Sequence, residues 1–229
     1  MCASIRDNIV PLVSNVNADS CDLRESLESI KQISNTQLPV VLSLLNHSDA
    51  AVVKEAIYAL ARSNRVDSVD AIWNCKCKKD ELVRVAIIES AEALSDKSHE
   101  KEMRFLLTDS SRLVRSWAAT AYATLYPQKA QFHLKKLLSA ERFYIVKVSI
   151  LIGLYSLGEK GYLYEVFGLL KHRSYIVRHA AANSIEFYIR KNDTKLAIAA
   201  IEKRIPRENN KGVKDCFERV VHTLRKRLD

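Results

Sequence analysis

A valine followed by a basic residue recurs six times along the chain at nearly even intervals. Successive valines lie 30, 31, 32, 31 and 36 residues apart, at Val53, Val83, Val114, Val146, Val177 and Val213. A repeat of this length is typical of proteins built from stacked copies of one supersecondary unit. Each such unit has to bury its apolar face against the next copy, so this recurrence constrains the fold more than any other feature.

The residues around each valine have the spacing of an amphipathic α-helix. Apolar or small residues follow most of the valines at +3, +4, +7 and +11, positions that share one helical face. A second apolar segment precedes each of these helices. Polar stretches with capping residues separate the two segments, at Ser48, Asp80, Asp109, Ser174 and Asn209. We therefore expect an all-α fold, an α-solenoid of stacked antiparallel helix pairs.

The same periodicity predicts the organisation of the whole chain. We expect one domain over residues 1–229, opened by an atypical capping pair at 1–36 that lacks the valine–base signature. Six repeats are expected to follow, at 37–65, 66–97, 98–126, 127–158, 159–192 and 193–229.

The repeated pattern is a small or acidic residue, valine, a base and then a small residue, and it resembles the short, prokaryotic-type HEAT repeats first associated with phycobilin lyases. The resemblance implies a right-handed HEAT-like, armadillo-like solenoid in which the base of each repeat bonds to its neighbour. The residues of this inter-repeat ladder would be Lys54, Arg84, Arg115, Lys147, Arg178 and Lys214.

The acids of the pattern are less regular than the bases. Asp49, Asp80 and Asp109 occupy shifting registers, and later repeats offer Arg142, Arg173 or Asn209 instead. We therefore expect a ladder that is intact in the early repeats and broken in the late ones. The alternative is that the six bases form a row of phosphate contacts, which is most plausible near Arg178, where the sequence offers no local acid.

Charge is unevenly distributed along the chain. The formal net charge is +9, made up of −2 over residues 1–115 and +11 over residues 116–229. A basic half indicates an acidic partner, either protein or nucleic acid. We find no secretory signal and no apolar run long enough to cross a membrane, and five scattered cysteines fit reduced thiols. The sequence therefore predicts a cytoplasmic protein without a membrane partner.

In a solenoid of this kind, the second helices of the pairs would line a concave surface. Helix geometry places positions +2, +6, +9 and +13 from each valine opposite the core stripe. From these positions we predict a partner-binding surface made of Glu89, Glu92, Asp96, Val148, Ile152, Tyr155, His179, Asn183, Arg190, Arg219, His222 and Lys226. Val148, Ile152 and Tyr155 are the expected apolar anchors. The alternative is that neighbouring repeats cover these three.

The chain contains no catalytic motif that we recognise, so we expect no catalytic residues, no cofactor, no metal and no enzyme activity. The predicted function is a scaffold that binds a partner protein, as an adaptor, inhibitor or immunity-type protein. One alternative is nucleic-acid binding through Arg190, Arg219 and Lys226 in the basic C-terminal repeats. A further alternative is an enzyme like the HEAT-like alkylpurine DNA glycosylases, but its candidate aromatic residue, Trp117, falls on the predicted core face.

Overall fold

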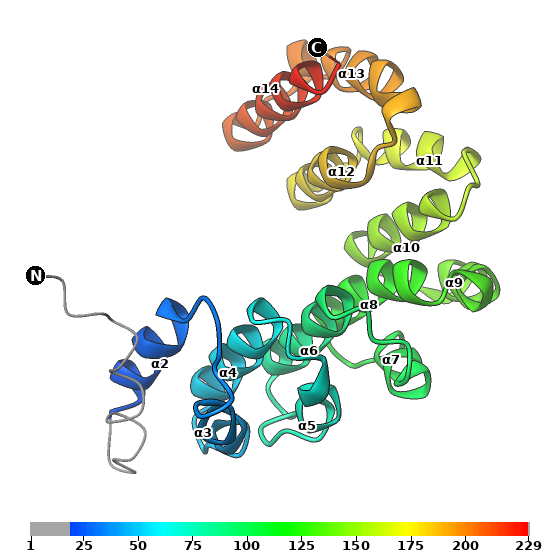
Figure 1. Cartoon of the computed structure of the whole chain (residues 1–229). Helices are drawn as coiled ribbons and strands as arrows, with labels where there is room; N and C mark the ends of the chain where they lie inside the picture. The colour runs from blue at the N-terminus through cyan, green and yellow to red at the C-terminus, as the bar shows by residue number, and fades with distance from the viewer. Residues whose placement is uncertain (1–18, 229) are drawn as a thin grey trace, which may run out of the picture. The chain divides into compact units, whose positions relative to one another are not determined.

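The computed structural model describes residues 19–228, and every regular element in that part of the chain is a helix (Figure 1). The prediction of an all-α fold is thereby confirmed. The first helix of the predicted N-terminal capping pair falls within residues 1–18 and lies outside the described residues. Its expected partner is present as α2, Ser20–Ser29.

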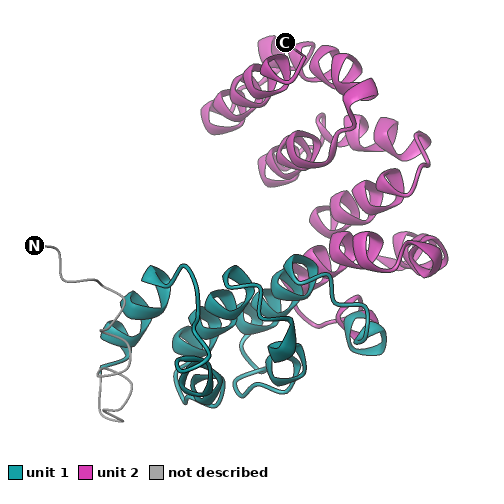
Figure 2. Ribbon diagram, in the orientation of Figure 1, with its two compact units in different colours: residues 1–103 teal, residues 104–229 magenta. Residues whose placement is uncertain are grey.

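The chain divides into two compact units, residues 1–103 and 104–229 (Figure 2). In unit 1, α2, α4 and α6 pack side by side, while α3 packs on α4 and α5 packs on α6. After α2, the elements are α3 Leu38–Leu44, α4 Ala50–Arg62, the 3-10 turn η2 Val66–Ser68, α5 Val69–Trp73 and α6 Glu81–Ala93. The unit boundary falls inside α7, Glu100–Leu106.

Unit 2 is built from two layers of helices. One layer consists of α8, α10, α12 and α14, each in contact with the next, and α9, α11 and α13 pack against it. The elements are α8 Arg112–Leu125, α9 Pro127–Ala140, α10 Tyr144–Ser156, α11 Gly161–Leu169, α12 Tyr175–Tyr188, η3 Lys191–Asp193, α13 Thr194–Glu202, η4 Ile205–Arg207 and α14 Lys211–Lys226. This alternation of layers is the stacking of helix pairs that the sequence predicts. The prediction of a single domain over residues 1–229 stays a prediction.

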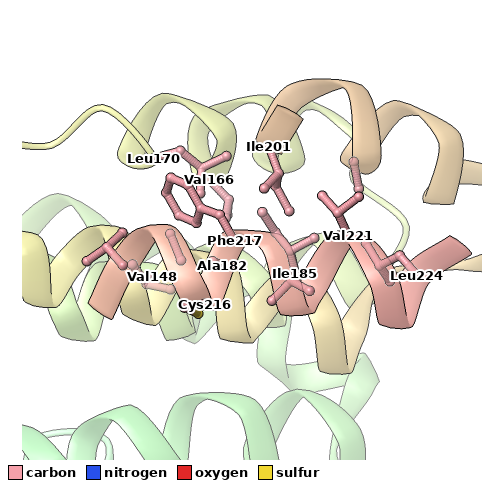
Figure 3. Close-up of a cluster of buried hydrophobic side chains, with 14 of the residues drawn as sticks. Val148, Val166, Leu170, Ala182, Ile185, Ile201, Cys216, Phe217, Val221 and Leu224 are labelled. Atoms are coloured by element: carbon pink, nitrogen blue, oxygen red, sulfur yellow. The ribbon is translucent and has the colours of Figure 1, made fainter. Parts of the chain in front are cut away.

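All six repeated valines are buried, with at most 6% of their surface exposed. In unit 2, the core behind them is shared by several helices: Val166 of α11, Ile185 of α12, Ile201 of α13 and Phe217 of α14 belong to one cluster (Figure 3). Burying a side chain such as Phe217 contributes about 1.5–3 kcal/mol. Since each helix pair supplies only part of this cluster, the core exists only when the pairs are stacked.

Several of the helices that carry a repeated valine, here called the inner-layer helices, begin with a side-chain cap. Asp49 and Asp80 accept backbone N–H groups at the starts of α4 and α6, and Asn210 does so for α14. Such caps contribute about 1 kcal/mol each. The sequence identifies Asp80 correctly, whereas Ser48 and Asn209 lie one residue before the actual caps.

Three of the turns that end inner-layer helices place a residue in the left-handed region, at Asn64 after α4, Ser95 after α6 and Gly158 after α10. Ser95 has φ 54° and Gly158 has φ 111°. A non-glycine residue in the left-handed region destabilises the folded state by about 1–2 kcal/mol. A glycine avoids this strain but lowers the stability by about 0.5–1 kcal/mol, because it loses more conformational entropy on folding. A Cβ at Gly158 would meet no atom within 4 Å, so a substitution there tests the backbone conformation alone.

We therefore expect Ser95→Gly to raise the free energy of unfolding by about 0.5–1 kcal/mol. Gly158→Ala is the matched opposite and should lower it by about 1 kcal/mol. Chemical denaturation of both variants beside the wild type measures the two effects. A destabilising Ser95→Gly would show that this turn is not held in the left-handed region in solution.

Candidate interaction surface

The three predicted apolar anchors are buried inside unit 2. Val148 and Ile152 are each 1% exposed and belong to the core cluster shared with α12 and α14 (Figure 3), and Tyr155 is fully buried. The Tyr155 hydroxyl donates a hydrogen bond of 2.9 Å to the Asp193 carboxylate. The prediction that these residues face a partner is wrong, because α10 packs between α8 and α12 as well as against α9 and α11. The alternative, that neighbouring repeats cover them, is correct.

Two of the three predicted acidic contacts in unit 1 are occupied by internal hydrogen bonds. The Tyr58 hydroxyl donates to Glu89 over 2.5 Å, and the Trp73 indole N–H donates to the buried Asp96 over 2.8 Å. Burial raises the pKa of Asp96, but the hydrogen bonds from Ser98, Trp73 and His99 outweigh it and hold the pKa below its usual value. Asp96 therefore acts as a buried acceptor, while Glu92 on the same face of α6 is half-buried.

The structure brings together three of the predicted residues on α12 and α14. The Arg219 guanidinium donates to Asn183 Oδ1 over 2.6 Å, and the Asn183 amide lies 3.1 Å from His179 Nδ1. Arg219 also forms an ion pair with the buried Glu186. The bonds of Arg219 join α14 to α12, so these side chains serve the stack itself.

The other predicted residues of the C-terminal repeats lie outside this network. Arg190 donates to the backbone carbonyls of Tyr155 and Ser156 over 2.6 and 3.1 Å, and its guanidinium stacks 4.9 Å from the Tyr155 ring. It therefore links the end of α12 to the end of α10. His222 and Lys226 are exposed on α14.

The ladder arginines Arg115 and Arg178 make the same set of contacts in unit 2. Arg178 donates to the carbonyls of His172 and Arg173, in the loop before its own helix, over 2.8 and 3.2 Å. It also makes a two-pronged ion pair with Glu208, with both hydrogen bonds at 2.6 Å. Each arginine thus holds its own loop and the loop that precedes the next inner-layer helix.

Arg115 repeats this arrangement with the carbonyls of Asp109 and Ser110 and with Glu141, the last over 2.8 and 3.2 Å. The expectation that the ladder breaks in the late repeats is therefore wrong for Arg178, which pairs with an acid of the next repeat. The acids were missed because each lies in the next repeat: Glu141 stands 26 residues after Arg115, and Glu208 stands 30 residues after Arg178.

Of the other four ladder bases, Arg84 makes the same contacts to its own loop, and the three lysines make different ones. Arg84 donates to the carbonyls of Lys78 and Lys79 over 2.8 and 2.9 Å. Lys147 lies 5.1 Å from the Tyr144 ring, Lys54 lies 3.3 Å from a carboxylate oxygen of its neighbour Glu55, and Lys214 is exposed.

Loss of the buried ion pair should be costly for folding. Glu208→Ala leaves Arg178, whose side chain is 13% exposed, without its carboxylate, and we expect the free energy of unfolding to fall by about 3 kcal/mol. The control is Glu202→Ala, which removes the exposed ion pair with Arg225 and should cost less than about 1 kcal/mol. Equal losses in the two variants, measured by denaturant titration, would contradict a structural role for the pair.

The same pair predicts a dependence of stability on pH. The Arg178 guanidinium holds the pKa of Glu208 below its ordinary value of 4.5. A carboxyl with a lowered pKa in the folded state stabilises the fold above that ordinary value and loses the effect as pH falls through the folded pKa. The difference in unfolding free energy between wild type and Glu208→Ala should therefore shrink as pH falls from about 6 to about 3. A difference that is constant over this range would refute the ion pair.

The surface that sequence reasoning missed lies where the inner-layer helices of unit 2 begin. Six large apolar side chains are exposed there, and we call this set the aromatic edge. They are Leu113 (37% exposed) and Trp117 (36%) on α8, Phe143 (50%) and Tyr144 (45%) at the start of α10, and Tyr175 (54%) and Ile176 (50%) at the start of α12.

Contacts between repeats connect parts of the aromatic edge. The Arg112 guanidinium, at the start of α8, lies 5.9 Å from the Phe143 ring. The Tyr144 ring lies 4.4 Å from the ring of His172, in the loop before α12. These contacts link the start of α8 to the start of α10, and the start of α10 to the loop before α12.

A signal for this edge was present in the sequence. The residue before the valine is large and apolar in four repeats, as Leu82, Leu113, Ile145 and Ile176. Trp117 was expected on the core face because it stands at +3, where most other repeats have small residues such as the fully buried Ala56 and Ala86. That placement is wrong, since a large side chain at a position that accommodates a small one has to protrude.

No protein-family model matches the sequence, and no curated protein matches it either. Solved structures do resemble the fold. The complex of CpcE and CpcF of phycocyanin lyase from Nostoc sp. PCC7120 aligns over 93% of each chain, with a TM-score of 0.62 and 14% sequence identity. An archaeal HEAT-like repeats protein from Thermococcus onnurineus NA1 aligns over 92% of this chain and 98% of its own, with a TM-score of 0.44 and 14% identity.

These similarities correct one prediction and confirm another. The prediction that the chain is not an enzyme does not stand, because a structure with the same fold over nearly the whole chain is that of a phycocyanin lyase. Among the described residues, no helix combines the length and the apolar character needed to cross a membrane. The predicted architecture is confirmed: the chain has the fold of HEAT-like repeat proteins.

Proposed function

We propose that this chain is a helical-repeat binding protein whose aromatic edge receives a partner protein. The observation that carries this proposal is the clustering of six exposed large apolar side chains over three successive repeats. Contiguous apolar surface of this kind is unusual on a protein that works alone, and aromatic residues are prominent among the anchors of protein interfaces. Tyr144 and Tyr175 combine an apolar ring with a hydroxyl. The hydroxyl can hydrogen-bond to water in the free protein, and the ring can be buried when a partner binds.

The nucleic-acid alternative is weakened by the bonding of its predicted contacts. Arg190 donates to backbone carbonyls of α10, and Arg219 is paired with Glu186 and Asn183. Reaching a phosphate would break these bonds.

The likeness to the CpcE–CpcF complex supports the same conclusion, because that structure contains two proteins in one assembly. By analogy, we propose that this chain works within a protein complex. We place the protein in the cytoplasm, since Cys21, Cys75, Cys77 and Cys216 are all free thiols, as a reducing compartment would leave them.

The experiment compares the proteins that co-purify with three forms of the full chain from its native cell. Trp117→Ala, Tyr144→Ala and Ile176→Ala together remove one side chain from each repeat of the aromatic edge. The control replaces three exposed aromatics outside the edge, on α7, α9 and α11, with Phe105→Ala, Phe132→Ala and Tyr164→Ala. Exposed positions change stability little, so thermal unfolding should show both triple variants folded.

We expect quantitative mass spectrometry to find specific proteins with the wild type and the control but not with the edge variant. Retention of the same proteins by the edge variant would reject the aromatic edge as the binding surface. Loss from the control alone would place the binding surface on α7, α9 and α11 instead.

A further inference from the structure

A row of basic residues accompanies the aromatic edge. Arg112, Arg142 and Arg173 are exposed, and they recur at intervals of 30 and 31 residues, each next to or close before an exposed apolar residue of the edge. None of the three has a carboxylate partner among the described residues. The edge therefore presents an arginine beside an apolar side chain three times, once as the first residue of α8 and twice in a loop, two residues before α10 and α12.

Two acids in the loops of unit 2 form ion pairs with other arginines and do not neutralise this row. Glu141 is held by Arg115, and Glu208, whose side chain is 2% exposed, is held by Arg178. Unit 2 as a whole contains 24 lysines and arginines against 11 aspartates and glutamates. The positive charge along the edge is therefore not cancelled locally, and it complements a negatively charged partner.

The spacing of the row limits the conformation of that partner. Packed helices lie about 8–10 Å apart, so Arg142 and Arg173, which both stand two residues before their helices, should lie about that far from each other. A polyproline II segment rises about 3.1 Å per residue with three residues per turn, which places every third side chain on one face about 9.3 Å apart. An α-helix needs about six residues to advance the same distance, and six residues do not complete whole turns.

We propose that the aromatic edge binds an extended acidic segment of a partner protein, with a carboxylate at every third residue and an apolar residue beside it. This inference rests on the proposed protein-binding function and adds the chemistry and the conformation of the bound segment. The carboxylates pair with Arg112, Arg142 and Arg173 in turn. The apolar residues pack against the exposed side chains that separate the arginines.

The test uses the full chain and labelled nine-residue peptides, with binding measured by fluorescence anisotropy. The first peptide contains three copies of Glu-Leu-Pro, and a second has the same composition with the three glutamates consecutive. A third peptide carries Gln in place of Glu. A labelled random-sequence DNA duplex is the fourth probe and represents the other class of polyanion.

We expect the first peptide to bind and the second and third to bind roughly tenfold more weakly, because register and charge are both required. Binding of the first peptide should weaken as ionic strength rises from about 0.05 M to about 0.5 M. Equal binding of the first two peptides would overturn the inferred spacing. Preferential binding of the duplex would overturn the inferred partner class.

Charge reversal tests the row directly. Arg112→Glu, Arg142→Glu and Arg173→Glu together should abolish binding of the first peptide. The control reverses three exposed lysines of the other layer, with Lys136→Glu, Lys195→Glu and Lys203→Glu, and it changes the net charge equally. If both variants lose binding to the same extent, overall charge explains the binding and the inferred row is wrong.

Failure of this inference can be told apart from failure of the proposed function. Loss of co-purifying proteins from the Trp117, Tyr144 and Ile176 variant, together with no binding of the first peptide, would keep the protein-binding function and reject the acidic segment. Binding of the first peptide that survives the same three alanine substitutions would reject the aromatic edge itself.

Discussion

The burial of each repeated valine depends on helices from more than one repeat, and the rest of the architecture follows from this dependence. An isolated pair such as α11 and α12 would leave one side of its apolar surface in water. Adding the next pair completes a cluster such as the one that joins Val177, Ile185 and Phe217. Because every copy both needs and provides a neighbour, the stabilising interactions run along the stack and link sequentially adjacent repeats.

Polar contacts reinforce this stacking at the loops. Arg115 and Arg178 each connect their own helix to two loops. One is the loop before that helix, through backbone carbonyls, and the other is the loop before the next inner-layer helix, through a glutamate carboxylate. Both carboxylates also accept backbone N–H groups of their own loops, as Glu208 does from Asn210. The arginines therefore fix the positions of the loops that carry the aromatic edge and the basic row.

Much of the fold could be predicted from the sequence, because the period near 31 residues and the apolar stripe of each helix are patterns visible in the sequence itself. The inner surface could not be predicted in the same way. Helix geometry identifies the side of α10 opposite the valine stripe, but it does not reveal that α12 covers this side. Val148 and Ile152 were therefore misplaced. Arg190 and Asp96 were misplaced for a related reason, since their partners Tyr155 and Trp73 lie 35 and 23 residues away in the sequence.

The position of the aromatic edge has a consequence for how such a protein can change over evolution. Phe143, Tyr144, Tyr175 and Ile176 stand at helix starts and are about half exposed, so few core contacts depend on them. Substitutions at exposed positions usually alter stability by no more than about 0.5 kcal/mol. Substitutions at these positions can therefore change the binding surface one repeat at a time while the fold stays stable. Proteins that share this fold by descent can in this way come to bind different partners.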